Sequence, residues 1–126
     1  MTSNHDRIQY YRFTAKQKTE TIRRLAKALE GERRIKLAIV FGSLTRRNSV
    51  RDIDLCILAE PALDFKELLN LNAQIELELG MSIDLVQLTS LPPSLRTEIL
   101  KNGTLIKGQK DLIKRLQNDH KPRLPA

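Results

Sequence analysis

Asp52-Ile53-Asp54-Leu55 opens an apolar run near the middle of the sequence. Side chains alternate between the two faces of a strand, so Asp52 and Asp54 share one face while Ile53 and Leu55 point into a core. Two carboxylates on one face repel each other, and a bound divalent cation removes that repulsion. The pattern therefore predicts a strand over residues 52–58 with an acidic pair at its start. The alternative is a pair of exposed acids at a strand edge.

A third carboxylate, Asp84, lies in a similar apolar stretch, Ser82-Ile83-Asp84-Leu85-Val86. A charge in a strand is costly unless it is paired, exposed at an end or bound to a metal. Hard cations such as Mg²⁺, with Mn²⁺ as a substitute, prefer carboxylate oxygens. Three carboxylates on neighbouring strands, Asp52, Asp54 and Asp84, could then hold one or two metal ions over a triphosphate.

Features suited to phosphate precede the acidic pair. Residues 35–41 are nearly continuous in hydrophobicity and predict a strand buried on both faces, which ends in Gly42-Ser43. Gly42 permits a tight turn with free backbone N–H groups, and the Ser43 hydroxyl can donate to a phosphate oxygen. Arg46 lies on the basic connection that follows, where it could neutralise triphosphate charge. The alternative for this arginine is a solvated basic loop.

Helices are expected on either side of these strands. Thr14 with Gln17, and Asp64 with Glu67, have the spacing of a capping box, which predicts helices that run to about residues 31 and 79. Further elements are expected in order along the C-terminal part: a strand over 82–88, a helix from Pro92-Pro93 to Lys101, a short strand over 104–107 and a final helical turn over 111–116.

The alternation of strands and helices predicts an α/β or α+β fold with a small mixed sheet of three to four strands packed with helices. With 126 residues, we expect one domain over 1–126, flexible at 1–13 and 118–126. The longest apolar run is too short to span a bilayer and the N-terminus is polar, so we expect a cytoplasmic protein. Cys56, the only cysteine, is interpreted as a buried small hydrophobe.

Charge and composition limit the partners. The net charge is +7 and the isoelectric point about 9.9, which favours polyanionic partners such as nucleotides or RNA. Aromatic residues make up only 4% of the chain and tryptophan is absent, which disfavours a base-stacking surface for single-stranded nucleic acid.

Taken together, Phe41-Gly42-Ser43-Leu44-Thr45-Arg46, Asp52-Ile53-Asp54-Leu55 and the later Asp84 resemble the motif of the DNA polymerase beta-type nucleotidyltransferase superfamily. Within it, the chain is similar to the minimal nucleotidyltransferases that pair with HEPN-domain toxins in toxin–antitoxin modules. The likeness covers residues 35–107. The loop before the first aspartate has eight residues, 44–51, and is shorter than is usual in the family.

The resemblance implies transfer of a nucleoside monophosphate, with AMP from ATP as first choice, to a hydroxyl on a partner protein. Asp52 and Asp54 would bridge two metal ions, and Asp84 would bind the one that activates the acceptor. Gly42, Ser43 and Arg46 would bind the nucleotide. The expected partners are ATP or another NTP and a HEPN-type protein, with a second copy of the chain as the alternative that completes the acceptor site. The alternatives are an antitoxin that acts by binding alone, and an RNA-directed nucleotidyltransferase.

Overall fold

The computed structural model describes residues 11–42, 49–50 and 52–119. Its helices are α1 (Ala15–Leu29), α3 (Phe65–Leu79), α4 (Pro93–Asn102) and α5 (Lys110–Asp119), with a 3-10 turn over Leu88–Ser90. Its strands are β1 (Tyr11–Arg12), β2 (Ile35–Phe41), β3 (Ser49–Val50), β4 (Ile53–Ala59), β5 (Ile83–Gln87) and β6 (Thr104–Lys107).

Four strands form the main sheet, in the order β5-β4-β2-β6. Strand β4 runs antiparallel to β2 and parallel to β5, so the sheet is mixed, as the sequence predicts. A parallel pair needs a crossover connection, which α3 supplies between β4 and β5. The short strands β1 and β3 pair separately with each other.

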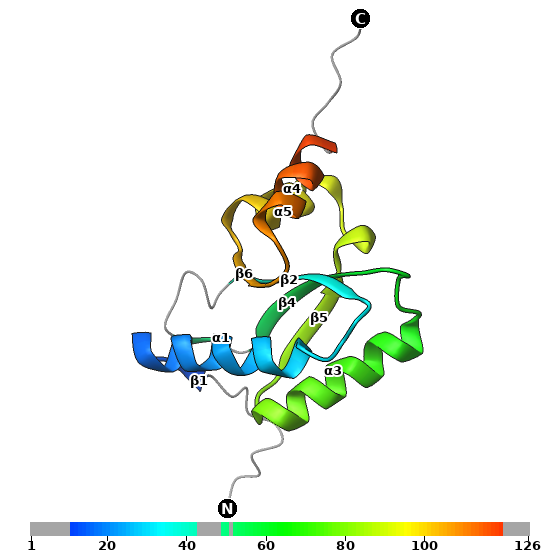
Figure 1. Cartoon of the computed structure of the whole chain (residues 1–126). Coiled ribbons are helices and arrows are strands. Elements are labelled where there is room, and N and C mark those ends of the chain that lie inside the picture. Colours follow the sequence, from blue (N-terminus) through cyan, green and yellow to red (C-terminus); the bar gives the residue numbers. More distant parts are fainter. Residues whose placement is uncertain (1–10, 43–48, 51, 120–126) are drawn as a thin grey trace, which may run out of the picture.

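Helices cover both faces of this sheet (Figure 1). On one face, α1 and α3 bury Leu25, Leu29 and Ile75 against the strands. On the other face, α4 buries Ile99 and Leu100, and α5 packs its apolar side against the same cluster. Burial on both faces explains why the central strands β2 and β4 are almost continuously apolar.

Capping boxes fix where α1 and α3 begin. The side chain of Thr14 accepts a hydrogen bond from the Gln17 backbone N–H at 3.1 Å, and the Gln17 side chain accepts one from the Thr14 backbone N–H at 2.9 Å. Asp64 and Glu67 repeat the arrangement at 2.8 and 3.1 Å. Both helix starts are therefore confirmed. The α3 helix ends at Gly80 in the left-handed conformation that glycine adopts most readily.

Side chains of α3 also protect the outer edge of the sheet. Strand β5 lies at that edge, where its outward N–H groups would otherwise lack a strand partner. Glu76 Oε2 accepts from the Ile83 N–H at 2.8 Å, and Asn72 Oδ1 accepts from the Leu85 N–H at 3.0 Å. These two bonds tie the helix to the strand that carries Asp84.

Some element limits differ from the expectations. Residues 11–13 were expected to be flexible, yet Tyr11–Arg12 form β1 and Phe13 is buried in the core. Helix α5 extends to Asp119, beyond the expected end at residue 116, and Gln117 Nε2 in the added turn donates to the Leu100 carbonyl oxygen of α4 at 3.4 Å. Strand β5 ends at Gln87 rather than 88. The expected flexibility of 1–10 and 120–126 lies outside the described residues.

Cys56 lies in β4 and is buried, as interpreted from the sequence. Burial raises the pKa of its thiol to about 12, so the reactive thiolate is scarce at neutral pH. None of the helices in the described residues is long and apolar enough to cross a membrane.

Candidate active site

The end of β2 and the start of β4 meet at one end of the sheet. Phe41, the last residue of β2, is the register partner of Asp54 on β4. Gly42 follows with a φ of 73°, a conformation that residues with a Cβ rarely adopt. A Cβ on Gly42 would also collide with the Asp54 carboxylate. The turn thus requires glycine for its conformation and for the close approach of the acidic side chain.

Asp84 lies beside Asp54 across the parallel pair of strands. The two residues are register partners on β4 and β5, so their side chains leave the same face of the sheet. Asp54 is half-buried and Asp84 is exposed. The flanking residues Ile53 and Ile83 point into the core on the opposite face. The structure therefore brings these two predicted residues together.

Asp52 stands just before β4 and is oriented by a serine. The Ser82 hydroxyl donates to Asp52 Oδ1 at 2.6 Å, and the Ser82 carbonyl accepts from the Ile53 N–H at 2.9 Å. Sequence reasoning did not assign Ser82 a role. The signal in the sequence is only that Ser82-Ile83-Asp84 matches Asp52-Ile53-Asp54 in spacing. The pairing itself, Ile53 with Ile83 and Asp54 with Asp84, comes from the structure.

Two of the predicted nucleotide-binding residues, Ser43 and Arg46, lie outside the described residues. The remaining one, Gly42, lies directly beside Asp54. The described part of the predicted site therefore consists of Gly42 and the three aspartates.

The donor chemistry of these aspartates fits a hard divalent cation, because carboxylate oxygens are its preferred protein ligands. Within residues 11–42, 49–50 and 52–119, no three His, Cys, Asp or Glu side chains are grouped as ligands of a metal ion. The aspartates thus share one end of the sheet without forming a closed three-ligand cluster.

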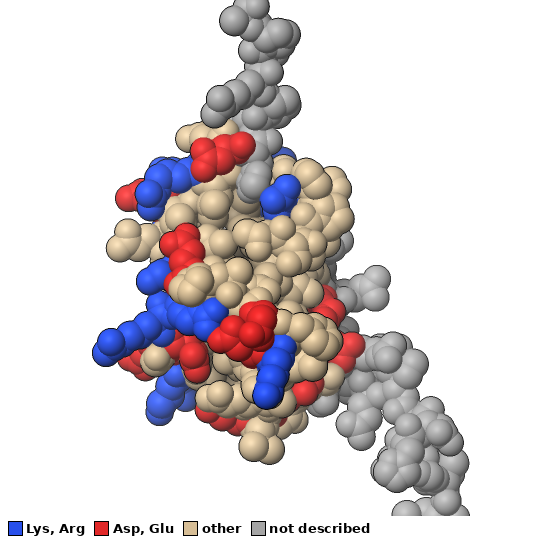
Figure 2. Space-filling model, turned by 90° about the vertical axis from the view of Figure 1, so that its right-hand side faces the viewer, with Lys and Arg blue, Asp and Glu red and all other residues tan. Residues whose placement is uncertain are grey.

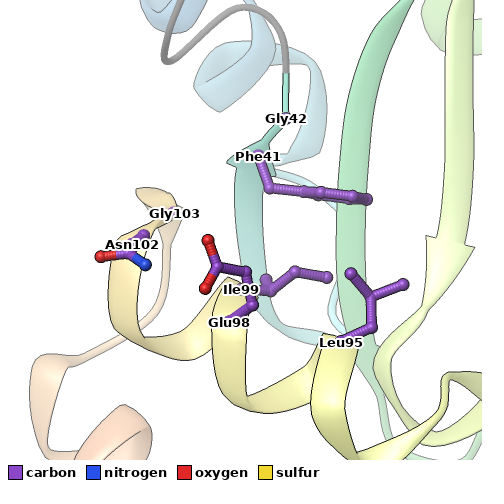
Figure 3. Close-up of a pocket in the computed structure, with 7 residues that line it drawn as sticks. All are labelled: Phe41, Gly42, Leu95, Glu98, Ile99, Asn102 and Gly103. Carbon is purple, nitrogen blue, oxygen red and sulfur yellow. The ribbon is translucent and has the colours of Figure 1, made fainter.

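A pocket of about 420 Å³ opens next to Gly42, between the end of β2 and α4. Phe41, Leu95 and Ile99 supply its apolar side, as Figure 3 shows. Glu98 and Asn102, spaced four residues apart on α4, supply its polar groups. The volume lies within the range of small-molecule sites. Sequence analysis missed this pocket, since it depends on how α4 packs on β2.

Gly103 allows α4 to approach the strand closely enough to shape this pocket. A Cβ at Gly103 would collide with the Ile39 side chain and lie 2.7 Å from the Ile99 carbonyl oxygen. The end of α4 is therefore held directly against β2, on the sheet face from which the Asp54 and Asp84 side chains emerge.

Known proteins share the family and the fold of this chain. The family model described as "Polymerase beta, Nucleotidyltransferase" matches residues 23–112, well over half of the chain. The chain therefore belongs to the polymerase beta nucleotidyltransferase family. No curated protein sequence matches it.

Solved structures of toxin–antitoxin pairs share the fold. A tri-AMPylated Shewanella oneidensis HEPN toxin in complex with MNT antitoxin matches with a TM-score of 0.69 and 22% identity, over 82% of each chain. A toxin–antitoxin structure with AMP-PNP matches with a TM-score of 0.67 and 25% identity, over 79% of this chain and 82% of that one. The MntA-HepT toxin–antitoxin structure matches with a TM-score of 0.66 and 21% identity, over 81% and 82%.

Proposed function

We propose that this protein transfers AMP from ATP to a hydroxyl on a HEPN-type partner protein, and so acts as the antitoxin of a toxin–antitoxin pair. The observation that carries the proposal is the placement of Gly42 against Asp54, with Asp84 next to Asp54 on the neighbouring strand. The chain also belongs to the nucleotidyltransferase family. Support for the acceptor comes from the similar fold of an antitoxin solved with an AMPylated HEPN toxin.

Asp52, Asp54 and Asp84 would hold Mg²⁺, or Mn²⁺ in its place. When bound, the metal would supply charge stabilisation of the triphosphate and would lower the pKa of the acceptor hydroxyl. Ser82 would keep one oxygen of Asp52 in position through its 2.6 Å hydrogen bond.

The backbone at Gly42, together with Ser43 and Arg46, would bind the phosphates. The nucleoside would then extend into the neighbouring pocket, where the Phe41 ring offers an apolar surface and Glu98 and Asn102 offer hydrogen-bonding groups. This placement keeps the phosphates at the acidic end of the sheet.

An antitoxin that acts by binding alone is the second candidate. The loop of eight residues between Gly42-Ser43 and Asp52 favours it, because a shorter loop alters where Arg46 can reach. RNA as the acceptor is less favoured. On the face shown in Figure 2, the described lysine and arginine side chains lie among acidic ones and form no continuous basic surface.

An assay with labelled ATP distinguishes AMP transfer from an antitoxin that acts by binding alone. The protein, Mg²⁺ and a HEPN-type candidate partner, sought among the neighbouring genes, are incubated together, and label on the partner is compared between wild type and Asp54→Asn. Transfer predicts label with wild type and none with the variant. Equal neutralisation of the partner by both proteins, without label, would overturn transfer and support binding alone.

A further inference from the structure

Helix α3 carries an apolar stripe on its outward side. Phe65, Leu69 and Leu77 are 75%, 53% and 86% exposed, and the exposed Ala73 continues the same four-residue spacing. Residues four apart lie on one side of a helix, so these four form a continuous row. The helix already has a buried side, formed by Leu71, Ile75 and Leu79 on the sheet. A second apolar row on a helix at the periphery indicates a contact surface (Figure 1).

A polar row runs beside this stripe, one residue further along at each step: Lys66, Asn70, Gln74 and Glu78. All four are exposed. The row begins with a positive charge and ends with a negative one. In the described part of the chain, neither Lys66 nor Glu78 takes part in an ion pair.

We propose that the stripe binds a second copy of this chain, with the two α3 helices antiparallel about a two-fold axis. Such a contact is self-complementary, because each pairing occurs twice. It would place Phe65 against the partner's Leu77, two large apolar residues, and Leu69 against the partner's Ala73, where a large residue meets a small one. The stripe of one copy then packs on the stripe of the other.

The charges fit the same arrangement. A two-fold axis of this kind keeps the polar rows of both copies on one side of the contact. Lys66 then faces the partner's Glu78, and Asn70 faces the partner's Gln74. Opposite charges at such flanking positions set the orientation of paired helices. In a parallel pair the two-fold axis would put the two polar rows on opposite sides of the contact, where Lys66 and Glu78 could not pair.

The rest of α3 and of the sheet is compatible with this contact. Glu76 and Asn72 are already engaged with the edge strand β5, so the copies meet through helices rather than through sheet edges. The pocket beside Gly42 lies on the α4 side of the sheet, and α3 lies on the other. Dimerisation would therefore leave the candidate active site open, and the proposal is independent of the proposed function.

Sedimentation equilibrium on the full chain tests the pairing. Lys66→Glu and Glu78→Lys should each raise the dimer dissociation constant, because each sets like charges together. An equimolar mixture of the two variants should recover the wild-type value, since the mixed dimer has two opposite-charge pairs. Leu77→Asp should raise the constant by about tenfold or more. Lys114→Glu, an exposed change on α5, serves as the control and should leave it unchanged.

Circular dichroism confirms that each variant is folded, which is expected because all the altered side chains are exposed. A wild-type chain that stays monomeric at about 1 mM would overturn the proposal. The proposal would also be overturned if Leu77→Asp left the dimer dissociation constant unchanged. The same holds if the mixture of Lys66→Glu and Glu78→Lys dimerised no more tightly than each variant alone. Loss of HEPN-partner binding by Leu77→Asp, with a monomeric wild type, would assign the stripe to that partner instead.

Discussion

Gly42 and Asp54 lie so close that a methyl group on the glycine would collide with the carboxylate. Gly42 directly follows β2 and Asp54 is the second residue of β4. The contact therefore joins the turn expected to hold phosphate to the side chain expected to hold the metal. The two halves of the motif are therefore coupled sterically.

Gly42→Ala should weaken Mg-ATP binding and lower stability, because the new methyl group must displace Asp54 in addition to adopting a positive φ. Gly80→Ala is a matched control: its φ is 67° and nothing lies within 4 Å of the added Cβ. The control should cost about 1–2 kcal/mol of stability and leave nucleotide affinity unchanged. Thermal unfolding and calorimetry measure both effects. Equal nucleotide affinities in the two variants would contradict the coupling.

Ser82→Ala should reduce metal affinity by about 10-fold to 100-fold, the range seen when the partner of a metal ligand is removed. The variant loses the hydroxyl that donates to Asp52 at 2.6 Å. Ser82→Thr keeps a hydroxyl and should restore part of the loss, whereas Ser90→Ala, an exposed serine elsewhere, should change nothing. Mn²⁺ titration provides the measurement, and no difference between Ser82→Ala and wild type would remove Ser82 from the site.

The fold should not depend on a metal, since its core is apolar on both sides of the sheet. EDTA is expected to leave the urea unfolding midpoint unchanged. Ile39→Ala, at a side chain only 1% exposed, should cost about 2–5 kcal/mol. Lys36→Ala on the same strand is exposed and should cost little. Unfolding by EDTA alone would mean that the site is structural.

The ion pair between Arg34 and Glu67 should make stability dependent on pH. The Arg34 hydrogen bond, and then the Asp64 backbone, hold the pKa of Glu67 below its ordinary value of 4.5. A lowered carboxyl pKa stabilises the fold above pH 4.5 and loses that effect as the pH falls through the folded pKa. Wild type should therefore exceed Glu67→Gln in stability at pH 7, and the gap should close in acid.

Arg34→Ala separates the contribution of the ion pair to this pH dependence from that of the helix cap. In that variant Glu67 retains its capping contact with Asp64 but loses the guanidinium. Adding Glu67→Gln to Arg34→Ala should therefore change the pH dependence of stability less than Glu67→Gln does in the wild-type chain. Equal changes in the two backgrounds would assign the effect to the helix cap rather than to the ion pair.

The features that depend on residues close together in the sequence, namely helix caps and strand alternation, were predicted correctly. The capping boxes at Thr14 and Asp64 fixed two helix starts because their hydrogen bonds span only three residues. Alternation along β4 correctly placed Ile53 and Leu55 in the core. The Ser82–Asp52 bond was missed because it depends on the register between two strands far apart in sequence.

Packing between elements explains the other differences. The pocket at Phe41 and Glu98 forms where α4 lies against β2. The packing of these two elements cannot be predicted from the sequence of either one alone. Residues 11–13 end a segment that is mostly polar and terminal, yet Phe13 is buried in the core and Tyr11 pairs with Val50. The expected roles of Ser43 and Arg46 stay predictions, because these residues lie outside the described part of the chain.

Calorimetric titration with Mg-ATP tests the central claim most directly, namely that the end of the sheet formed by Gly42, Asp54 and Asp84 binds a metal–nucleotide complex. Asp54→Asn removes a negative charge with little change in shape and should keep the fold. The account predicts saturable binding by wild type and its loss in Asp54→Asn, with Asp111→Asn, an exposed acid on α5, unaffected. Equal affinity for Mg-ATP in wild type and Asp54→Asn would contradict it.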